Sequence, residues 1–577
     1  MSLQKNKGVI SSLKKRLAPR ALTALILCCL LLSLPASVSA HAYVVTSTPG
    51  ENEVLQDAPT SISITFNEPI ENAFHSIQVT DPSGQQAVSG ESRIDGGNSA
   101  TLLAELRPNL PDGIYTVNYK VLSSDGHTVT GTFPFIIGDE AAKHNTTASN
   151  EPGSSGGRAL PGTDLLLVRW LQYSGLALYM GTLLFHLVLL PRRSEKASAA
   201  VWQHSKRLLM LSLILAAAGI GLSLPQQTAS DAGVPWGQAW NPALLKDTLQ
   251  LTSFGNAWLY EMVLLLLLAG LTVVLAVFAE RSRLLASWGT VIALMITLGI
   301  LLAKSFIGHA AAANEKSMAI AMNFLHQASS FMWLGGLLSL VCLLPAAARA
   351  LRDKPDSKNQ IYWETIRRFS ILAACCVIIL LSSGIYAGLL YVPTWHALLN
   401  SNYGLVLLIK AGLTLIMLIL GLSAFLRGRK QSRPLGAGVW LEFGIGLIVL
   451  VVAAILSNMP TALSSPGPVH LKGTTPDGYH VAVKVTPNVI GQNNFEVTVH
   501  DHDQKPLHDI EQITLTLTSL SMDMGTIEFV LPKGESVPLT GNGLISMGGR
   551  WSLHVHILLS SLETIDSRFA FEVGTEK

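Results

Sequence analysis

The 577-residue sequence has few charged residues and no cysteine outside its apolar segments. Charged residues make up 14% of the chain, hydrophobic residues make up 49%, and the mean hydropathy is +0.40. These proportions predict a membrane protein with substantial soluble parts. Cys28 and Cys29 lie in an apolar run near the start, and Cys342, Cys375 and Cys376 lie in later apolar segments. No disulfide framework is therefore expected, and each soluble part must be stabilised by its own core.

Motifs of common enzymes and of nucleotide-driven pumps are also missing. The sequence has no GxxxxGK[ST] loop, no phosphorylated-aspartate signature, no HExxH and no catalytic triad pattern. We therefore expect neither a hydrolase nor an ATP-driven pump, and no enzymatic activity. The net charge is only +2, and the basic residues lie in loops between apolar segments, so no nucleic-acid partner is expected.

Residues 1–40 have the pattern of a signal peptide. A basic start is followed by the apolar run ALTALILCCLLLSL and the small residues ASVSA. An uncleaved membrane anchor is the alternative. Cleavage after Ala40 would make His41 the mature N-terminus and give one metal ion both an α-amino and an imidazole nitrogen. Nitrogen ligands in a square plane suit Cu(II).

Residues 41–138 alternate short strands with turns and predict an antiparallel β-sandwich. Asp125-Gly126-His127 lies in a turn after the strand IYTVNYKV, where a carboxylate and an imidazole would complete an N/O copper site. Turns are rich in Asp and Gly for structural reasons, so this tripeptide alone is a weak signal. Residues 139–162 are polar and rich in Ser, Gly and Pro, and they predict a flexible linker.

The motifs of this first domain resemble a known family. HAYVVTSTPGENEVL, FNEPIE at 66–71 and YKVLSSDGHTVTGTFPF at 119–135 are similar to the periplasmic copper-binding protein CopC. The resemblance covers nearly the whole domain and implies Cu(II) ligation by His41, Asp125 and His127. No methionine occurs between residues 41 and 138, so the separate Cu(I) site of some family members is not expected here.

Eight apolar segments follow between residues 163 and 462, each near the roughly 20 residues that cross a bilayer. The four loops on one side contain 5, 2, 6 and 4 Lys or Arg residues, whereas the other side has only Lys246, Lys304 and Lys316. The positive-inside rule then places both soluble domains outside the plasma membrane. The predicted fold class is a membrane all-α eight-helix transmembrane bundle, flanked by two extracytoplasmic all-β sandwich domains.

The membrane block contains an internal repeat. Residues 169–191, ending in MGTLLFHLVLLP, align with 323–345, ending in LGGLLSLVCLLP, and residues 253–261 resemble 402–410. The repeat predicts two four-helix halves with a transport site near their interface.

The alignment pairs Gln172 with His326, and Glu261 with Lys410. We expect Glu261, near one end of the third span, to form an ion pair with Lys410.

Residues 305–336 contain the main candidate ligands of the membrane block. His309 lies where an apolar helix ends, and His326 lies inside the next helix. Trp333 and Met322, seven residues after and four before His326, share its helical face. Ionisable side chains at membrane depth indicate function by default, and imidazole binds both copper states. Hydrogen-bonded helix packing and haem ligation are the alternatives for the two histidines.

These motifs resemble the CopD family of copper-resistance and uptake membrane proteins. The similarity runs from Arg169-Trp170-Leu171 through SxxGHA at 305–310 and HxxxxxxWxGGL at 326–337 to YGxxLLxK at 403–410 and LSNMP at 456–460. It covers all eight apolar segments and implies a role in copper passage or resistance.

Residues 467–577 return to a period of two and predict a second small β-sandwich. The segments GQNNFEVTVHDHDQKPL, MDMG and MGGRWSLHV resemble a YtkA-like domain. Met522 and Met524, and likewise His554 and His556, would share a strand face if these segments are extended. Such faces suit copper, but a packed core explains the methionines equally well.

The sequence as a whole predicts copper uptake across the plasma membrane. The first domain would capture Cu(II), and the ion would then pass His309 and His326, driven by an ion gradient, the membrane potential or capture in the cytosol. The expected partners are copper ions, an extracytoplasmic copper chaperone, a cytosolic copper acceptor and membrane lipid. Two alternatives stay open: extracytoplasmic copper binding as resistance, and a haem-containing membrane redox protein that acts on copper.

Overall fold

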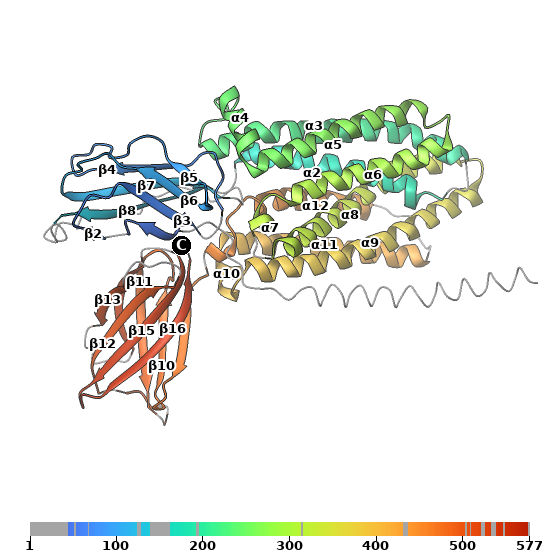
Figure 1. Cartoon of the computed structure of the whole chain (residues 1–577). Coiled ribbons are helices and arrows are strands. Elements are labelled where there is room, and N and C mark those ends of the chain that lie inside the picture. The colour runs from blue at the N-terminus through green and yellow to red at the C-terminus, as the bar shows by residue number, and fades with distance from the viewer. Residues whose placement is uncertain are drawn as a thin grey trace, which may run out of the picture.

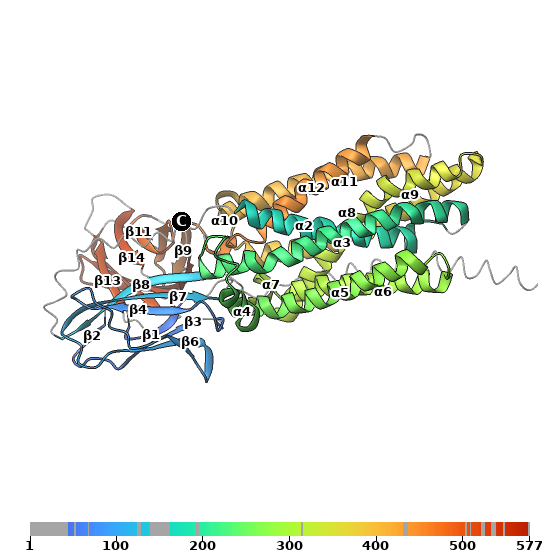
Figure 2. The ribbon, with the colours of Figure 1, turned by 90° about the horizontal axis from the view of Figure 1, so that it is seen from above.

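Two β-sheet domains lie at the same end of a long helical bundle, as two perpendicular views show (Figures 1 and 2). We call this end of the bundle the domain end and the opposite end the far end. The computed structural model describes residues 44–50, 53–66, 69–123, 128–138, 162–191, 195–312, 315–430, 437–464, 466–501, 503, 505–507, 509–520, 526–531, 538–545 and 548–574.

The N-terminal domain consists of two four-stranded sheets, in the orders β1-β3-β6-β5 and β2-β8-β7-β4. Buried side chains alternate along the strands, as in SISITF, because every second residue points into the space between the sheets. Tyr115 and Phe135 stack there with their ring centroids 5.1 Å apart. The strands are β1 (Val44–Thr48), β2 (Val54–Leu55), β3 (Ser61–Phe66), β4 (Ser76–Thr80), β5 (Arg93–Asp95), β6 (Asn98–Glu105), β7 (Gly113–Leu122) and β8 (Thr128–Ile137).

The C-terminal domain has the same two-sheet design, with the orders β14-β11-β10-β9 and β13-β12-β15-β16. Its core is centred on Trp551, which is 1% exposed. Both domains confirm the predicted β-sandwiches. The strands are β9 (Val469–Thr474), β10 (His480–Thr486), β11 (Gly491–His500), β12 (Ile510–Ser519), β13 (Thr526–Leu531), β14 (Leu539–Ile545), β15 (Gly549–Leu559) and β16 (Thr564–Val573).

Among the described residues, eight helices are long and apolar enough to cross a membrane, which confirms the predicted number of spans. Several continue beyond their apolar part, because a helix can extend into water where its side chains become polar. The long helices are α2 (Thr163–Leu184, continued by the π-helix Phe185–Leu189), α3 (Glu195–Ala232), α5 (Ser253–Phe278), α6 (Arg283–Ser305), α8 (Lys316–Ala350), α9 (Pro355–Tyr391), α11 (Asn402–Lys430) and α12 (Ala437–Leu456). The short helices are α4 (Pro242–Leu251), α7 (His309–Ala312), α10 (Trp395–Asn400) and the 3₁₀ turn Ala462–Ser464.

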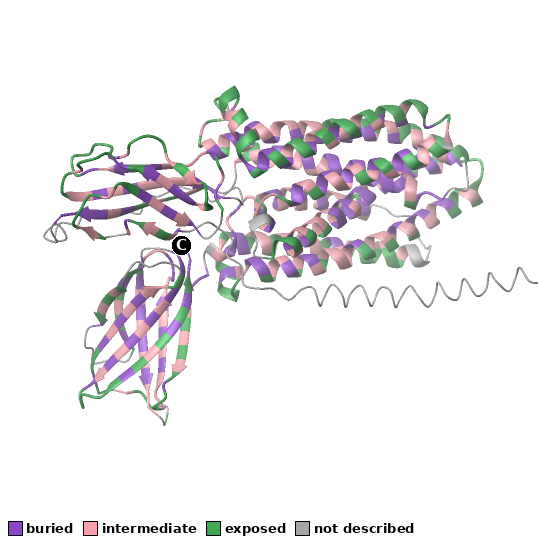
Figure 3. Cartoon of the chain, in the orientation of Figure 1, coloured by how far each residue is buried: buried purple, intermediate pink, exposed green. Residues whose placement is uncertain are grey.

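The outside of the bundle is apolar over a height that matches a bilayer. Buried residues concentrate inside the bundle and inside each sheet pair (Figure 3). Large aromatic side chains are exposed near both ends of two outer helices: Tyr260 and Phe278 on α5, and Trp288 and Phe306 on or next to α6. At 1.5 Å per residue, the two members of each pair are about 27 Å apart along the helix. This separation is close to the hydrocarbon thickness of a bilayer, at whose boundaries aromatic residues gather.

The two predicted halves meet where α2 crosses α8. Gly181 and Gly335, which are equivalent in the internal repeat, lie against each other at this crossing. A Cβ atom on Gly335 would overlap the carbonyl oxygen of Ala177, and one on Gly181 would overlap the backbone of Gly335. Only glycine therefore permits this approach of two backbones, a packing mode that is common between membrane helices.

The N-terminal domain is docked onto the first half of the bundle by two charged side chains. Glu71 accepts a hydrogen bond from the backbone N–H of Ser253 at the N-terminus of α5, over 3.0 Å. Lys120 donates to the carbonyl oxygen of Ala232 at the C-terminus of α3, over 3.4 Å. A carboxylate at a helix N-terminus and an ammonium at a C-terminus both complement the helix dipole. Burial raises the pKa of Glu71, and the hydrogen bonds from Ser253 oppose this shift.

Candidate functional site

A cavity of about 650 Å³ opens into the bundle from beneath the N-terminal domain. Its lining includes Glu71 and Leu122 of that domain, together with His309, Met322 and His326 of the bundle. The structure thus brings the three candidate membrane ligands into one space that also reaches the first β-domain. His326 is ten residues from the start of α8, so the cavity extends about 15 Å into the bundle from its domain end.

Hydrogen bonds to Ser383 determine which nitrogen of His326 carries the proton. The Ser383 hydroxyl lies 2.7 Å from the carbonyl oxygen of Ile379, to which it donates its one hydrogen. His326 Nδ1 lies 3.0 Å from the same hydroxyl oxygen and must therefore donate to it. The remaining ring nitrogen, Nε2, then has a lone pair. A second residue that fixes the tautomer of a ligating histidine in this way is typical of metal sites.

His309 lies nearer the cavity mouth, at the start of the short helix α7. Gly308 precedes it with φ +79°, a conformation that permits the sharp turn from α6 into α7. The His309 ring contacts Met459 and Tyr391: Nε2 is 3.2 Å from the Met459 carbonyl oxygen, and the two ring centroids are 5.8 Å apart. Met322, which is 5% exposed, also lines the cavity.

Within the described part of the chain, no three His, Cys, Asp or Glu side chains converge closely enough to bind a metal ion together. The bundle presents single donors along a wide cavity instead of a closed coordination sphere.

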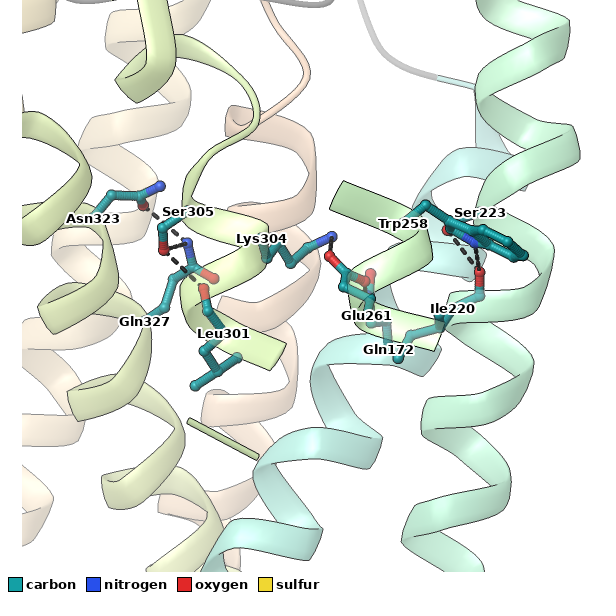
Figure 4. Close-up of polar contacts among 10 residues, drawn as sticks. All are labelled: Gln172, Ile220, Ser223, Trp258, Glu261, Leu301, Lys304, Ser305, Asn323 and Gln327. Carbon is teal, nitrogen blue, oxygen red and sulfur yellow. Dashed lines mark hydrogen bonds and ion pairs between the residues drawn. The ribbon is translucent and has the colours of Figure 1, made fainter. Parts of the chain in front are cut away.

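The expected ion pair between Glu261 and Lys410 is absent, because Glu261 has other partners. Its carboxylate lies 4.0 Å from Lys304 Nζ and accepts a 2.8 Å hydrogen bond from the Gln172 amide (Figure 4). Glu261 is 2% exposed and Lys304 is 7% exposed. Figure 4 also shows Gln327 between Asn323 and Ser305, which is the next polar contact along the cavity wall.

The internal repeat explains why the pairing prediction was wrong. Glu261 on α5 faces Gln172 on α2, and their repeat equivalents in the second half, Lys410 and His326, line the cavity of about 650 Å³. Glu261 therefore has its partners, Gln172 and Lys304, in its own half. In the first half, Lys304 forms an ion pair with Glu261, which is also hydrogen-bonded to Gln172. In the second half, the equivalent residues His326 and Lys410 face the cavity.

Replacing Glu261 by Gln should destabilise the bundle by about 3–5 kcal/mol, because it leaves the Lys304 charge buried without its carboxylate. The amide can still accept the hydrogen bond from Gln172, so the change tests the charge alone. Adding Lys304→Met to Glu261→Gln should restore most of the lost stability. Adding Lys410→Met instead should not restore it. Thermal unfolding of the detergent-solubilised variants measures both effects, and equal rescue by the two lysine changes would contradict this pairing.

A second cavity, of about 310 Å³, lies towards the far end and shares Leu418 with the first. Its lining is apolar except for Ser370, the Trp333 indole and the Glu442 carboxylate, and Glu442 is 3% exposed. Among the described residues, no hydrogen bond or ion pair reaches this carboxylate. In the sequence, Glu442 stands out as a single acidic residue in an apolar run, and this is the signal that could have marked it as a functional residue. The sequence does not show which residues surround it.

The predicted Cu(II) ligands of the first domain, His41, Asp125 and His127, lie outside the described residues. The described residues next to them are strand ends: Val44 pairs with Phe66, and Leu122 pairs with Thr128 across the gap that contains residues 124–127. Leu122 also lines the large cavity. The strand end that leads into the predicted copper loop therefore borders the cavity that contains His326.

In the C-terminal domain, His554 and His556 share one carboxylate. His554 Nε2 and His556 Nδ1 lie 2.8 and 2.9 Å from Asp566 Oδ1 on the neighbouring strand. The hydrogen bond from His556, and then that from His554, lowers the pKa of Asp566. The two histidines are on one strand face, as expected. Met522 and Met524 lie outside the described residues, so metal binding by this face stays a prediction.

Comparisons with known proteins cover most of the chain. Residues 44–138 match the family described as CopC domain, residues 163–315 match Copper resistance protein D-like, N-terminal domain, and residues 363–456 match Copper resistance protein D. Copper transport protein CutJ of Bacillus subtilis (strain 168) is 35% identical over 94% of this chain and 98% of its own length.

Shorter similarities cover the first domain. Protein YobA of Escherichia coli (strain K12) is 30% identical over 18% of this chain and 82% of its own length. The crystal structure of CopC from Methylosinus trichosporium OB3b has 30% identity over 17% of this chain and 93% of that chain, with a TM-score of 0.16.

Proposed function

Because the chain belongs to the family of copper transport and resistance proteins with CopC and CopD domains, we propose that it carries copper into the cell across the plasma membrane. The cavity that connects the first domain to His326 is the observation that carries this proposal. A protein that only binds copper outside the cell needs no cavity that extends into its membrane helices. If copper passes through the bundle, this cavity is the entrance to its path.

The proposed path begins at the first domain, which faces the outside of the cell. His41, Asp125 and His127 capture Cu(II) there, and an extracytoplasmic chaperone supplies it. The metal then enters the cavity past His309 and binds His326 Nε2, with Met322 as a softer neighbouring donor if copper is reduced. Beyond Leu418 the path continues through the second cavity to a cytosolic acceptor.

Uptake and resistance make opposite predictions for a strain that lacks this protein. Uptake predicts less copper in the cells and poor growth under a copper chelator, and restoring the gene should reverse both. Total cell copper by mass spectrometry is the measurement. Unchanged or raised cell copper in the deletion strain would refute uptake and favour resistance. A Soret band in the purified protein would instead support the haem alternative.

Replacing His41 by Ala should abolish tight Cu(II) binding and leave the β-domain folded, because it removes the imidazole and leaves the α-amine as this residue's single nitrogen donor. Cu(II) titration under a competing chelator measures the affinity, and circular dichroism checks the fold. His75→Ala is the matched control, because the His75 ring bonds Ser92 on the surface of the same domain, 3.2 Å away. An unaltered Cu(II) affinity of the His41 variant would rule out the N-terminal site.

A further inference from the structure

The cavity around His326 is far larger than a metal ion requires. A copper ion with about six waters fills roughly 200 Å³, since each water takes up about 30 Å³. The cavity measures about 650 Å³, a volume typical of sites for small organic molecules. Within the described residues it also lacks a converging set of three metal-binding side chains. A bare ion would therefore find neither a fitting space nor a coordination sphere.

The positive charges in the cavity wall also favour a ligand with an anionic group over a bare cation. Arg169, Lys304 and Lys410 all line it, and the buried carboxylate of Glu261 is paired with Lys304. Arg169 is 8% exposed, and its buried Nε has no hydrogen-bond partner among the described residues. A buried guanidinium needs an anionic partner, and its planar fork matches a carboxylate.

Two carboxylates of the described residues line the cavity, those of Glu71 and Asp231, and each accepts a hydrogen bond from the protein. Glu71 accepts from Ser253 where the first domain docks, and Asp231 accepts a 2.9 Å hydrogen bond from Gln227 at the domain end of α3. Among the described residues, neither carboxylate forms an ion pair with Arg169. Arg169 is six residues from the start of α2, so it lies about 9 Å inside the bundle.

We propose that copper enters this cavity as a complex with a small organic carboxylate, whose carboxylate group binds Arg169. Lys304 and Lys410 add positive potential around the ligand, and His326 Nε2 takes one coordination position of the metal. The inference rests on the proposed passage of copper through the bundle and names what accompanies the ion. It also assigns Arg169 as an anion-binding residue that recognises the ligand, not the metal.

Histidine and histamine form a matched pair of probes, because they chelate copper through the same amine and imidazole but only histidine has a carboxylate. Proteoliposomes containing the full chain should take up ⁶⁴Cu from the histidine complex about tenfold faster or more, the difference expected for one charge-assisted hydrogen bond. Radiolabelled histidine should bind to the purified protein only when copper is present. Equal uptake from both complexes, with no ligand binding, would overturn the inference. This comparison uses the wild-type chain, so it does not depend on the folding of a variant.

Arg169→Gln should remove the preference for histidine over histamine and leave Cu(II) capture by the first domain unchanged. Arg349→Gln is the matched control, because Arg349 is outside the cavity and its Nε donates to Pro345 of its own helix. Preference retained in Arg169→Gln would exclude Arg169 as the carboxylate site. If wild type transports no copper from any complex, the proposed function fails. Copper-dependent binding of histidine to purified wild type and Arg169→Gln still tests the inference by itself.

Discussion

Replacing His326 by Ala is expected to reduce copper passage to the background rate and to leave Cu(II) capture by the first domain intact. The reason is the geometry of the imidazole: Ser383 holds Nδ1–H, so Nε2 is the nitrogen with a lone pair for the metal. Alanine removes this donor from a cavity that has few others. Uptake of ⁶⁴Cu into proteoliposomes measures the loss, and Cu(II) titration of the same protein measures capture.

Two further variants separate ligation from packing at His326. Ser383→Ala should retain the imidazole but free it to rotate or change tautomer, and a loss of about 10–100-fold in transport is expected for such a supporting residue. His204→Ala should have no effect, because His204 is exposed and bonds only the backbone of its own helix. Normal uptake by the His326 variant would reduce this histidine to a packing role.

Gly335→Ala is expected to destabilise the bundle by about 3 kcal/mol or more, at the upper end of overpacking effects. The added methyl group would occupy the position of the Ala177 carbonyl oxygen, and a backbone cannot move aside as a side chain can. The helices α2 and α8 would have to separate along their whole contact. A protein stability of about 5–15 kcal/mol leaves little margin for this loss. Thermal unfolding in detergent and the yield of monodisperse protein measure it.

The chain offers graded controls for this glycine. Gly412→Ala adds the same methyl group inside α11, where nothing lies within 4 Å, so it should be tolerated. Gly336→Ala should give an intermediate effect, because its methyl group would meet the edge of the Phe369 ring, 3.1 Å away, and this ring can shift. An unfolding temperature of Gly335→Ala equal to that of Gly412→Ala would show that the crossing is looser than described.

The sequence predicted the parts of the fold that follow from local periodicity. Alternation in segments such as SISITF marked the strands, and apolar length together with basic loops marked the spans. The alignment of the segments that contain Gly181 and Gly335 predicted that the bundle has two halves. The structure adds that these two glycines contact each other. His309 and His326 were found as candidates because ionisable groups are unusual in apolar helices, and Met322 because it lies four residues before His326 on the same helical face.

The contacts between spans could not be predicted, because an apolar helix in a bundle has little amphipathic pattern to indicate its neighbours. Glu261 was therefore assigned to Lys410, although its partners are Lys304 and Gln172. Arg169 was visible only as part of a family motif. Its importance follows from burial and from the lack of a described partner, and both depend on how α2 lies in the bundle.

The two β-domains are attached to different halves of the bundle. Glu71 and Lys120 tie the first domain to α5 and α3, whereas Thr394 next to α10 bonds Pro466, where the second domain begins. The halves meet at the glycine crossing, so any rocking of one half against the other changes the distance between the two domains. Spin labels placed on the two domains would measure any such change in distance from outside the bilayer.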